Sequence, residues 1–464
     1  MEAKGSLTEM KTDKTDKTDV FENMPVPRAM MVMAFPMILS QLITLIYNLA
    51  DTWFIGLTNN PFMVAGCSLV LPAYMITIVI ANIFGVGGGT LVSRLLGIKN
   101  EEEAARVGAV SFWMSIGAAV FYSLTCLTLM NPFLHLLGAS ENTIGFARQY
   151  MLFVIVIGGI FSVMASTMSS TLRSIGYAGN ASKGLMLGGL LNIALDPLFM
   201  FVILPDGKQV LGAAIATMLS NMVSFGYFFL TYRKLKKKTI LTMNPGIGLP
   251  SGKSFRSIFA VGIPAAVSLL LFDLTNIVIN RLSAGHGDIE LAAIGIVLKA
   301  ERLPLNTGVG ICLGMVPLVA YNYSAGNIKR MKEIWNFSRI VGLIFAVICV
   351  ILYRTFAGQI IGAFIKDPDT MRYGTQFLRA RCFATPLMFL CFSMVHLMEA
   401  LGRGKDAFLL AVIRQLVFNI PILFLMDHLY GMNGIIWTQV IADCFTVTAS
   451  YLLYYKVKKS VGIR

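Results

Sequence analysis

Residues 36–51 read PMILSQLITLIYNLAD, an apolar run that carries Asn48 and Asp51 at its end. A similar run, PAAVSLLLFDLTNIVI, occupies residues 264–279, and Asn276 follows Pro264 at the distance at which Asn48 follows Pro36. About 20 predominantly apolar residues cross a bilayer as a helix, and each run has apolar neighbours that extend it to this length. The repetition predicts a helical membrane protein with two related halves.

The composition supports a membrane protein along the whole chain. Of its 464 residues, 56% are hydrophobic and 13% are charged. Soluble domains average about 45–50% apolar and about 25% charged residues. Apolar runs between polar breaks predict an all-α protein with about twelve transmembrane helices, at residues 29–57, 62–95, 106–131, 145–172, 181–203, 211–233, 256–283, 289–320, 334–356, 372–401, 406–426 and 432–456.

Basic residues give the expected orientation and the domain boundaries. Most of the 38 Lys and Arg residues lie in the tails or in the loops after even-numbered spans, so both termini are expected in the cytoplasm. The repeat KTDKTDKTD has no apolar core and is typical of disorder. We expect a disordered cytoplasmic tail at residues 1–24, an N-lobe at 25–233, a cytoplasmic linker at 234–255 that begins within RKLKKK, and a C-lobe at 256–464.

Each half contains six predicted spans, so both halves enter the membrane from the same side. Their pseudo-twofold axis is then expected along the membrane normal. Two such bundles that face each other can open a central cavity to either side in turn, which is the architecture of an alternating-access transporter.

Acidic residues inside spans identify candidate sites, because a charge at the bilayer centre costs about 2.5–3.5 kcal/mol on insertion scales. Asn48 and Asp51 share a helix face at spacing i,i+3, and Asn192 and Asp196 share one at i,i+4. Pro197 removes a backbone donor and can free a carbonyl one turn earlier. Carboxylate, amide and carbonyl oxygens suit Na⁺, and two neighbouring carboxylates also favour a bound proton.

The C-lobe has polar residues of its own. Asp273, Asn276 and Asn280 form a stripe on the seventh span, and Glu301 lies in the eighth. For this set we weigh a substrate or second proton site against a structural role. Glu301 is expected to pair with Arg302 or Lys299, and Glu399 with Arg403, whereas Asp443 has no assigned role.

Three segments resemble one transporter family: YNLADTWFIG (47–56), LRSIGYAGNASK (172–183) and LLNIALDPLFMF (190–201). They are similar to the multidrug and toxic compound extrusion (MATE) family, in particular its bacterial MepA-like branch. The resemblance covers about residues 25–458. It implies two six-helix lobes in a V shape and export of organic cations and amphiphiles in exchange for H⁺ or Na⁺.

The resemblance also implies an ion site in the N-lobe. It places this site on Asp51, Asn192 and Asp196, with Thr217 as a further ligand. Where some relatives carry an asparagine on the fourth span, this chain has Ser169, which makes Na⁺ coordination less complete. No cofactor other than H⁺ or Na⁺ is expected. The expected partners are a drug-like small molecule and membrane lipid, with no nucleic acid, and the protein is expected to be a monomer.

Other functions fit the sequence less well. GVGGG at residues 85–89 lies within a span and lacks a GK[ST] ending, so it predicts close helix packing rather than phosphate binding. A membrane-embedded enzyme would need a catalytic cluster, and no such pattern appears. A flippase for lipid-linked compounds would favour a basic cavity, against which the acidic residues in the spans argue.

Overall fold

The computed structural model describes residues 19–460, and every long element in this part of the chain is a helix. The helices are apolar around most of their circumference, which is typical of membrane spans. The N-lobe contains α2 (Val26–Gly56), α3 (Pro61–Gly97), α4 (Glu101–Thr128), α5 (Met130–Leu136), α6 (Glu141–Met151), η1 (Leu152–Ile157), α7 (Gly158–Ser174), α8 (Ala178–Pro197), η2 (Leu198–Ile203) and α9 (Gln209–Leu235).

The C-lobe follows the same plan. It contains α10 (Gly252–Ser283), α11 (Asp288–Ser324), α12 (Ile328–Gly362), α13 (Pro368–Arg381), α14 (Ala384–Ala400), α15 (Gly404–Val412), η4 (Ile413–Asn419), α16 (Ile420–Tyr430) and α17 (Met432–Ser460). Eleven helices within residues 19–460 are long and apolar enough to cross a membrane. A twelfth span is the pair α13 and α14, which bends by 50°. Pro386 lies in the first turn of α14, where its missing donor costs little.

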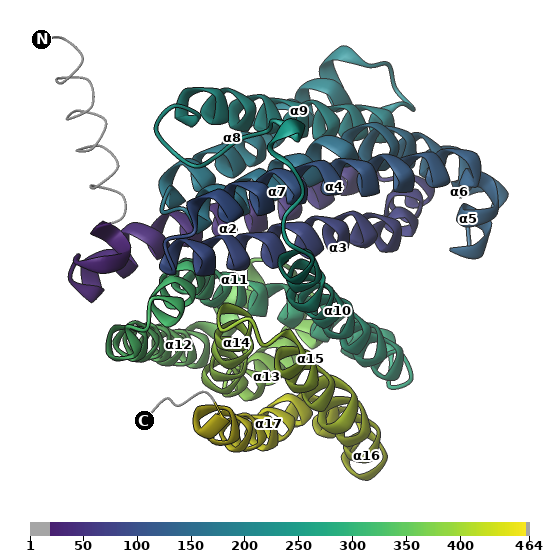
Figure 1. Cartoon of the computed structure of the whole chain (residues 1–464). Helices are drawn as coiled ribbons and strands as arrows, with labels where there is room; N and C mark the ends of the chain where they lie inside the picture. The colour runs from purple at the N-terminus through teal and green to yellow at the C-terminus, as the bar shows by residue number, and fades with distance from the viewer. Residues whose placement is uncertain (1–18, 461–464) are drawn as a thin grey trace, which may run out of the picture.

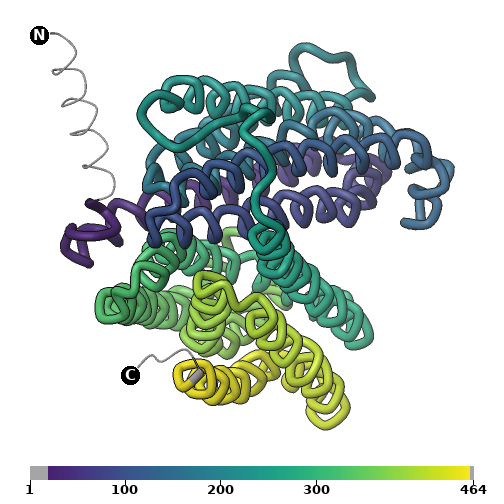
Figure 2. Tube along the Cα trace, in the orientation of Figure 1, coloured from purple at the N-terminus to yellow at the C-terminus, as the bar shows by residue number. Residues whose placement is uncertain are grey.

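The two lobes approach each other at one end and diverge at the other. In Figure 1, α11 lies close to α2 and α3, whereas the far ends of α6 and α10 point apart. Figure 2 shows the linker running from the N-lobe to the start of α10. This linker contains the short η3 (Pro245–Ile247), and Trp113 Nε1 holds it by donating to the carbonyl oxygen of Met243 at 2.9 Å.

Glycines allow the lobes to touch backbone to backbone. We call this contact the inter-lobe seam. A Cβ on Gly87 would overlap the carbonyl oxygen of Ile258, and one on Gly262 would overlap that of Ile83. A Cβ on Gly310 would lie 2.7 Å from the Cα of Ile38. Small residues permit such close helix crossings in membranes. The packing role predicted for GVGGG is therefore confirmed at Gly87.

The expected tail boundary at residue 24 is wrong, because the structure orders residues 19–24. Val20 and Phe21 are buried, and the Phe21 ring stacks on Tyr321 of α11 with centroids 4.8 Å apart. Arg330 donates to the carbonyl oxygen of Phe21 at 2.8 Å. These contacts compensate the loss of chain entropy that keeps a polar tail disordered. The rest of the expected tail, residues 1–18, lies outside the described residues.

Candidate functional site

The N-lobe carboxylates lie where helices change their winding. Asp196 and Pro197 end α8, and the chain continues as the π-helical turn η2. On the fourth span, Tyr150 lies just before the π-helical turn η1. π-helical turns inside membrane helices redirect side chains and often mark functional sites. The sequence signal for η2 is Pro197, which cannot donate to the preceding turn.

Asp196, Asn192 and Thr217 form one buried hydrogen-bonded group. Asn192 Nδ2 donates to Asp196 Oδ1 at 3.3 Å and to Thr217 Oγ1 at 3.3 Å. Asp196 is fully buried and Asn192 is 3% exposed. Asn192 and Asp196 therefore lie on one face of α8 and contact each other, as their i,i+4 spacing predicts.

Asp51 joins this group from α2. Its Oδ2 accepts a hydrogen bond from the Tyr150 hydroxyl at 3.4 Å, and its charge is close enough to interact with that of Asp196. Three buried oxygens in the group have no hydrogen-bond partner among the described residues: Asp51 Oδ1, Asn192 Oδ1 and Asp196 Oδ2. Because buried acceptors without donors are costly, this arrangement suits a small cation or a proton on one of the carboxylates.

Two residues expected near this group make other contacts. Asn48 is exposed and hydrogen-bonds to Tyr47. Ser169 Oγ donates to the carbonyl oxygen of Ala181 at 3.3 Å, and Ala181 lies near the opposite end of α8 from Asp196. Ser169 therefore lies away from the Asp196 group. On the same helix, Ser162 hydrogen-bonds to Tyr74, which lies close enough to Asp51 to interact with its charge.

The C-lobe contains a separate pocket of about 310 Å³ between α10, α11, α14, η4 and α17. Three of the four residues proposed from the sequence, Asn276, Asn280 and Glu301, line it. Asp273 lies 3.8 Å from Arg302, which also lines the pocket. Residues singled out from the sequence therefore share one pocket in the C-lobe.

The ion pairs expected in the C-lobe are wrong in detail. Glu301 pairs with Arg381, which donates through Nε at 2.8 Å and Nη2 at 3.0 Å. No role was predicted for Arg381, which ends α13 and is 3% exposed. Glu399 Oε2 lies 2.8 Å from His396 Nδ1, whereas Arg403 pairs with Asp406.

A buried polar network that was not predicted from the sequence adjoins the pocket, which its members Asn419 and Gln439 line. Arg414 of η4 donates to both oxygens of Asp443 at 2.8 and 3.1 Å. Gln439 links this pair to Asn419, since it donates to Asp443 at 2.8 Å and accepts from Asn419 Nδ2 at 3.1 Å. Arg414 and Asn419 both lie in the seven-residue π-helical turn η4, which presents them on one side of the span. The polar residues within the apolar run IRQLVFN could have indicated this buried network from the sequence.

The family model for MatE matches the chain twice, over residues 36–198 and 264–425. The two matches begin at the repeated prolines, so the internal duplication predicted from Pro36 and Pro264 is confirmed.

The chain belongs to the MATE family.

Its curated relatives in this family include the multidrug export proteins MepA of Staphylococcus saprophyticus and Staphylococcus aureus. Both are 31% identical to this chain, and the alignments cover 97% of the chain and 98% of each relative. These similarities confirm the expected MepA-like branch.

Solved structures of MATE transporters share the fold. A multidrug resistance MATE family transporter in an outward-facing conformation superposes with a TM-score of 0.91 at 21% identity, over 97% of this chain and 99% of that one. A MOP superfamily transporter from Pyrococcus furiosus gives a TM-score of 0.89 at 21% identity, over 96% and 98% of the two chains. The expected fold of two six-helix lobes is confirmed.

Proposed function

We propose that this protein is a secondary active multidrug exporter that exchanges H⁺ or Na⁺ for organic cations and amphiphiles by alternating access. Its relatives are multidrug export proteins, and family membership makes it a transporter. The main support for ion coupling is the buried group of Asp51, Asn192 and Asp196. Its three unpartnered oxygens provide a place for one small cation or for a proton.

The proposed location is the cell membrane, with both termini in the cytoplasm because the basic loops follow even-numbered spans. The inter-lobe seam lies in the halves of α3 and α11 that adjoin these loops. With this orientation the lobes are closed toward the cytoplasm and diverge toward the outside. An outside ion reaches Asp51 and Asp196 in this conformation and displaces the drug. The opposite conformation then releases the ion and admits another drug molecule.

The test is transport of the cationic dye rhodamine 123 in everted vesicles, where export from the cytoplasmic face appears as uptake into the lumen, under an imposed proton gradient and separately under a sodium gradient. We compare wild type with Asp51→Asn and Asp196→Asn, and use Asp369→Asn as the matched surface control, since Asp369 is exposed. We expect one gradient to drive efflux in wild type and the control, and both N-lobe variants to lose it by about tenfold or more.

The outcomes separate the parts of the proposal. Efflux by both N-lobe variants at the wild-type rate, with equal membrane insertion, would contradict ion coupling at Asp51 and Asp196. Absence of dye movement by wild type under either gradient would contradict export of organic cations.

A further inference from the structure

The C-lobe pocket has polar groups that its own contacts do not satisfy. Arg381 uses Nε and Nη2 for Glu301, and its Nη1 has no partner among the described residues although the side chain is 3% exposed. Asn419 is 1% exposed and uses Nδ2 for Gln415 and Gln439, which leaves Oδ1 without a donor. One buried donor and one buried acceptor therefore remain at the same pocket.

The charges around the pocket favour an anionic group. Two ion pairs neutralise themselves: Arg381 with Glu301, and Arg414 with Asp443. Arg302 lies 3.8 Å from Asp273. Lys299 also lines the pocket, and no hydrogen bond or ion pair joins it to another residue within 19–460. The pocket therefore has one more positive than negative charge.

The chemistry of the free donors favours a carboxylate. A guanidinium nitrogen and a lysine ammonium bind oxygen anions through charge-assisted hydrogen bonds, which are shorter and stronger than neutral ones. An unpartnered amide oxygen such as Asn419 Oδ1 needs an N–H or O–H donor. The volume of about 310 Å³ lies at the lower end of the range for small-molecule sites, and Phe272 and Met388 supply apolar lining.

We propose that the C-lobe pocket binds a small molecule whose carboxylate contacts Arg381 Nη1 and Lys299 and whose hydrogen-bond donor contacts Asn419 Oδ1. The proposal builds on the proposed function, because it places part of a transported compound in this pocket. It assigns the two lobes different tasks: the N-lobe carboxylates hold the coupling ion, and the C-lobe cations recognise the ligand.

The test uses two dyes that differ in one group. Rhodamine 110 has a free carboxylate, and rhodamine 123 is its methyl ester. Their affinities are measured by fluorescence anisotropy with the purified full chain in nanodiscs of neutral lipid, without any ion gradient. We expect wild type to bind rhodamine 110 about tenfold or more tightly than rhodamine 123, since hydrogen bonds to charged groups are the stronger class.

Two variants test the assignment. Arg381→Lys keeps a cation beside Glu301 but removes the free guanidinium nitrogen, and Lys299→Ala changes an exposed side chain that holds no partner within residues 19–460. We expect each variant to reduce the preference for rhodamine 110 to about threefold or less. The matched control is Arg372→Lys, because Arg372 is 70% exposed, and it should retain the wild-type preference.

Equal affinity of wild type for the two dyes would overturn the proposal, as would a full preference that persists in both variants. The result is separable from the proposed function. Gradient-driven efflux of rhodamine 123 without a carboxylate preference would support the proposed transport function and contradict the proposed carboxylate site. A preference for rhodamine 110 that depends on Arg381 and Lys299, without gradient-driven efflux, would support the proposed binding site and contradict the proposed transport mechanism.

Discussion

Tyr150 places one hydroxyl group inside a strongly apolar span, and this hydroxyl donates a hydrogen bond to Asp51 Oδ2 at 3.4 Å. Tyr150→Phe removes this donor and keeps the ring. A hydrogen bond of this kind contributes about 0.5–1.5 kcal/mol net, so we expect a shift of about two- to tenfold in the proton or sodium concentration that half-saturates efflux. The measurement is the dependence of rhodamine 123 efflux on the coupling ion.

The control for this variant is Tyr430→Phe, because Tyr430 is 64% exposed at the end of α16. Wild-type ion dependence in Tyr150→Phe would show that the hydroxyl has no part in the ion site.

Spacing along one helix was enough to predict some of these contacts. Asn192 and Asp196 are one helical turn apart, and any α-helix brings them together. Tyr150 of α6 meets Asp51 of α2 only in the folded lobe, where α6 packs against α3, and Arg381 meets Glu301 across about 80 residues of chain. Such partners depend on how the helices pack, which the pattern of one sequence does not contain.

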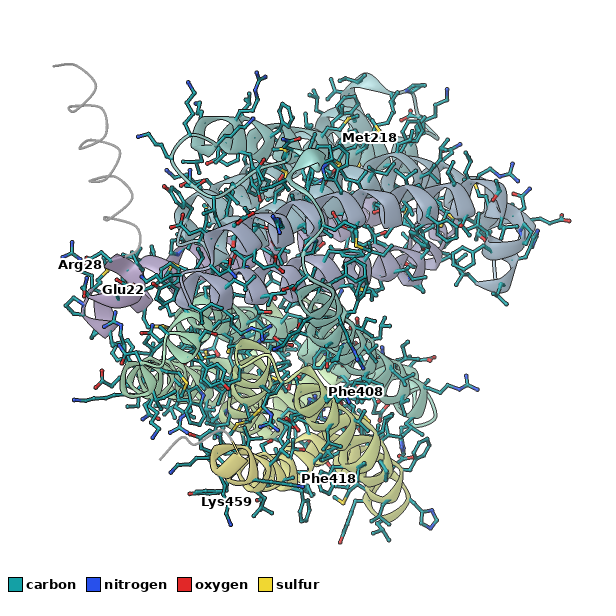
Figure 3. The ribbon with its side chains drawn as sticks, in the orientation of Figure 1. Glu22, Arg28, Met218, Phe408, Phe418 and Lys459 are labelled. Atoms are coloured by element: carbon teal, nitrogen blue, oxygen red, sulfur yellow. The ribbon has the colours of Figure 1, made fainter. Side chains whose placement is uncertain are left out.

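At the scale of elements, the segment of residues 19–24 joins both lobes. Glu22 contacts Lys99, which follows α3 of the N-lobe, and Tyr321 of α11 in the C-lobe. Figure 3 shows Glu22 beside the start of α2, at the end where the lobes meet. Hydrogen bonds from Lys99 and Tyr321 lower the pKa of Glu22 below its ordinary value of 4.5.

This shift has a definite sign. A lowered pKa in the folded protein stabilises it at pH values above the unfolded pKa, and the contribution is lost as pH falls through the lowered value. Glu22 and Lys99 are 37% and 64% exposed, so solvent screening limits the contribution to about 1 kcal/mol or less. We expect Glu22→Gln to lower the unfolding midpoint at pH 7 and to match wild type at pH values well below 4.5. A thermal unfolding series in detergent measures this, and a difference that grows with acidity would contradict it.

The inter-lobe seam gives a second prediction for an element. Gly262→Ala places a methyl group against the backbone of Ile83, and such overpacking costs about 1–3 kcal/mol. The closed seam should weaken, and buried Cys312 of α11 should react faster with a maleimide. Mass spectrometry of the alkylated peptide gives this rate. Gly117→Ala is the matched control, because no atom lies within 4 Å of a Cβ there, and unchanged alkylation in both variants would contradict the prediction.

At the scale of the whole molecule, the repeat predicts two six-helix lobes and their order along the chain. The alignment of the two runs also predicts that the lobes differ in their polar groups. Asp51 has Ile279 as its counterpart in the other run, so the second lobe lacks the first lobe's carboxylate on α10. The repeat does not predict at which end the two lobes are closed, because alternating access requires one sequence to adopt both arrangements.

The unequal distribution of charge between the lobes determines how the membrane voltage acts on transport. One monovalent ion on the N-lobe carboxylates, exchanged for one monocationic dye, moves no net charge. For a zwitterion the same exchange carries one positive charge inward, and about 2.3 kcal/mol per 100 mV then drives export, which corresponds to about fiftyfold accumulation. We expect an imposed potassium diffusion potential to accelerate export of rhodamine 110 and to leave that of rhodamine 123 unchanged. The net charge of each compound would then determine whether the ion concentration gradient alone, or this gradient together with the membrane voltage, drives its export.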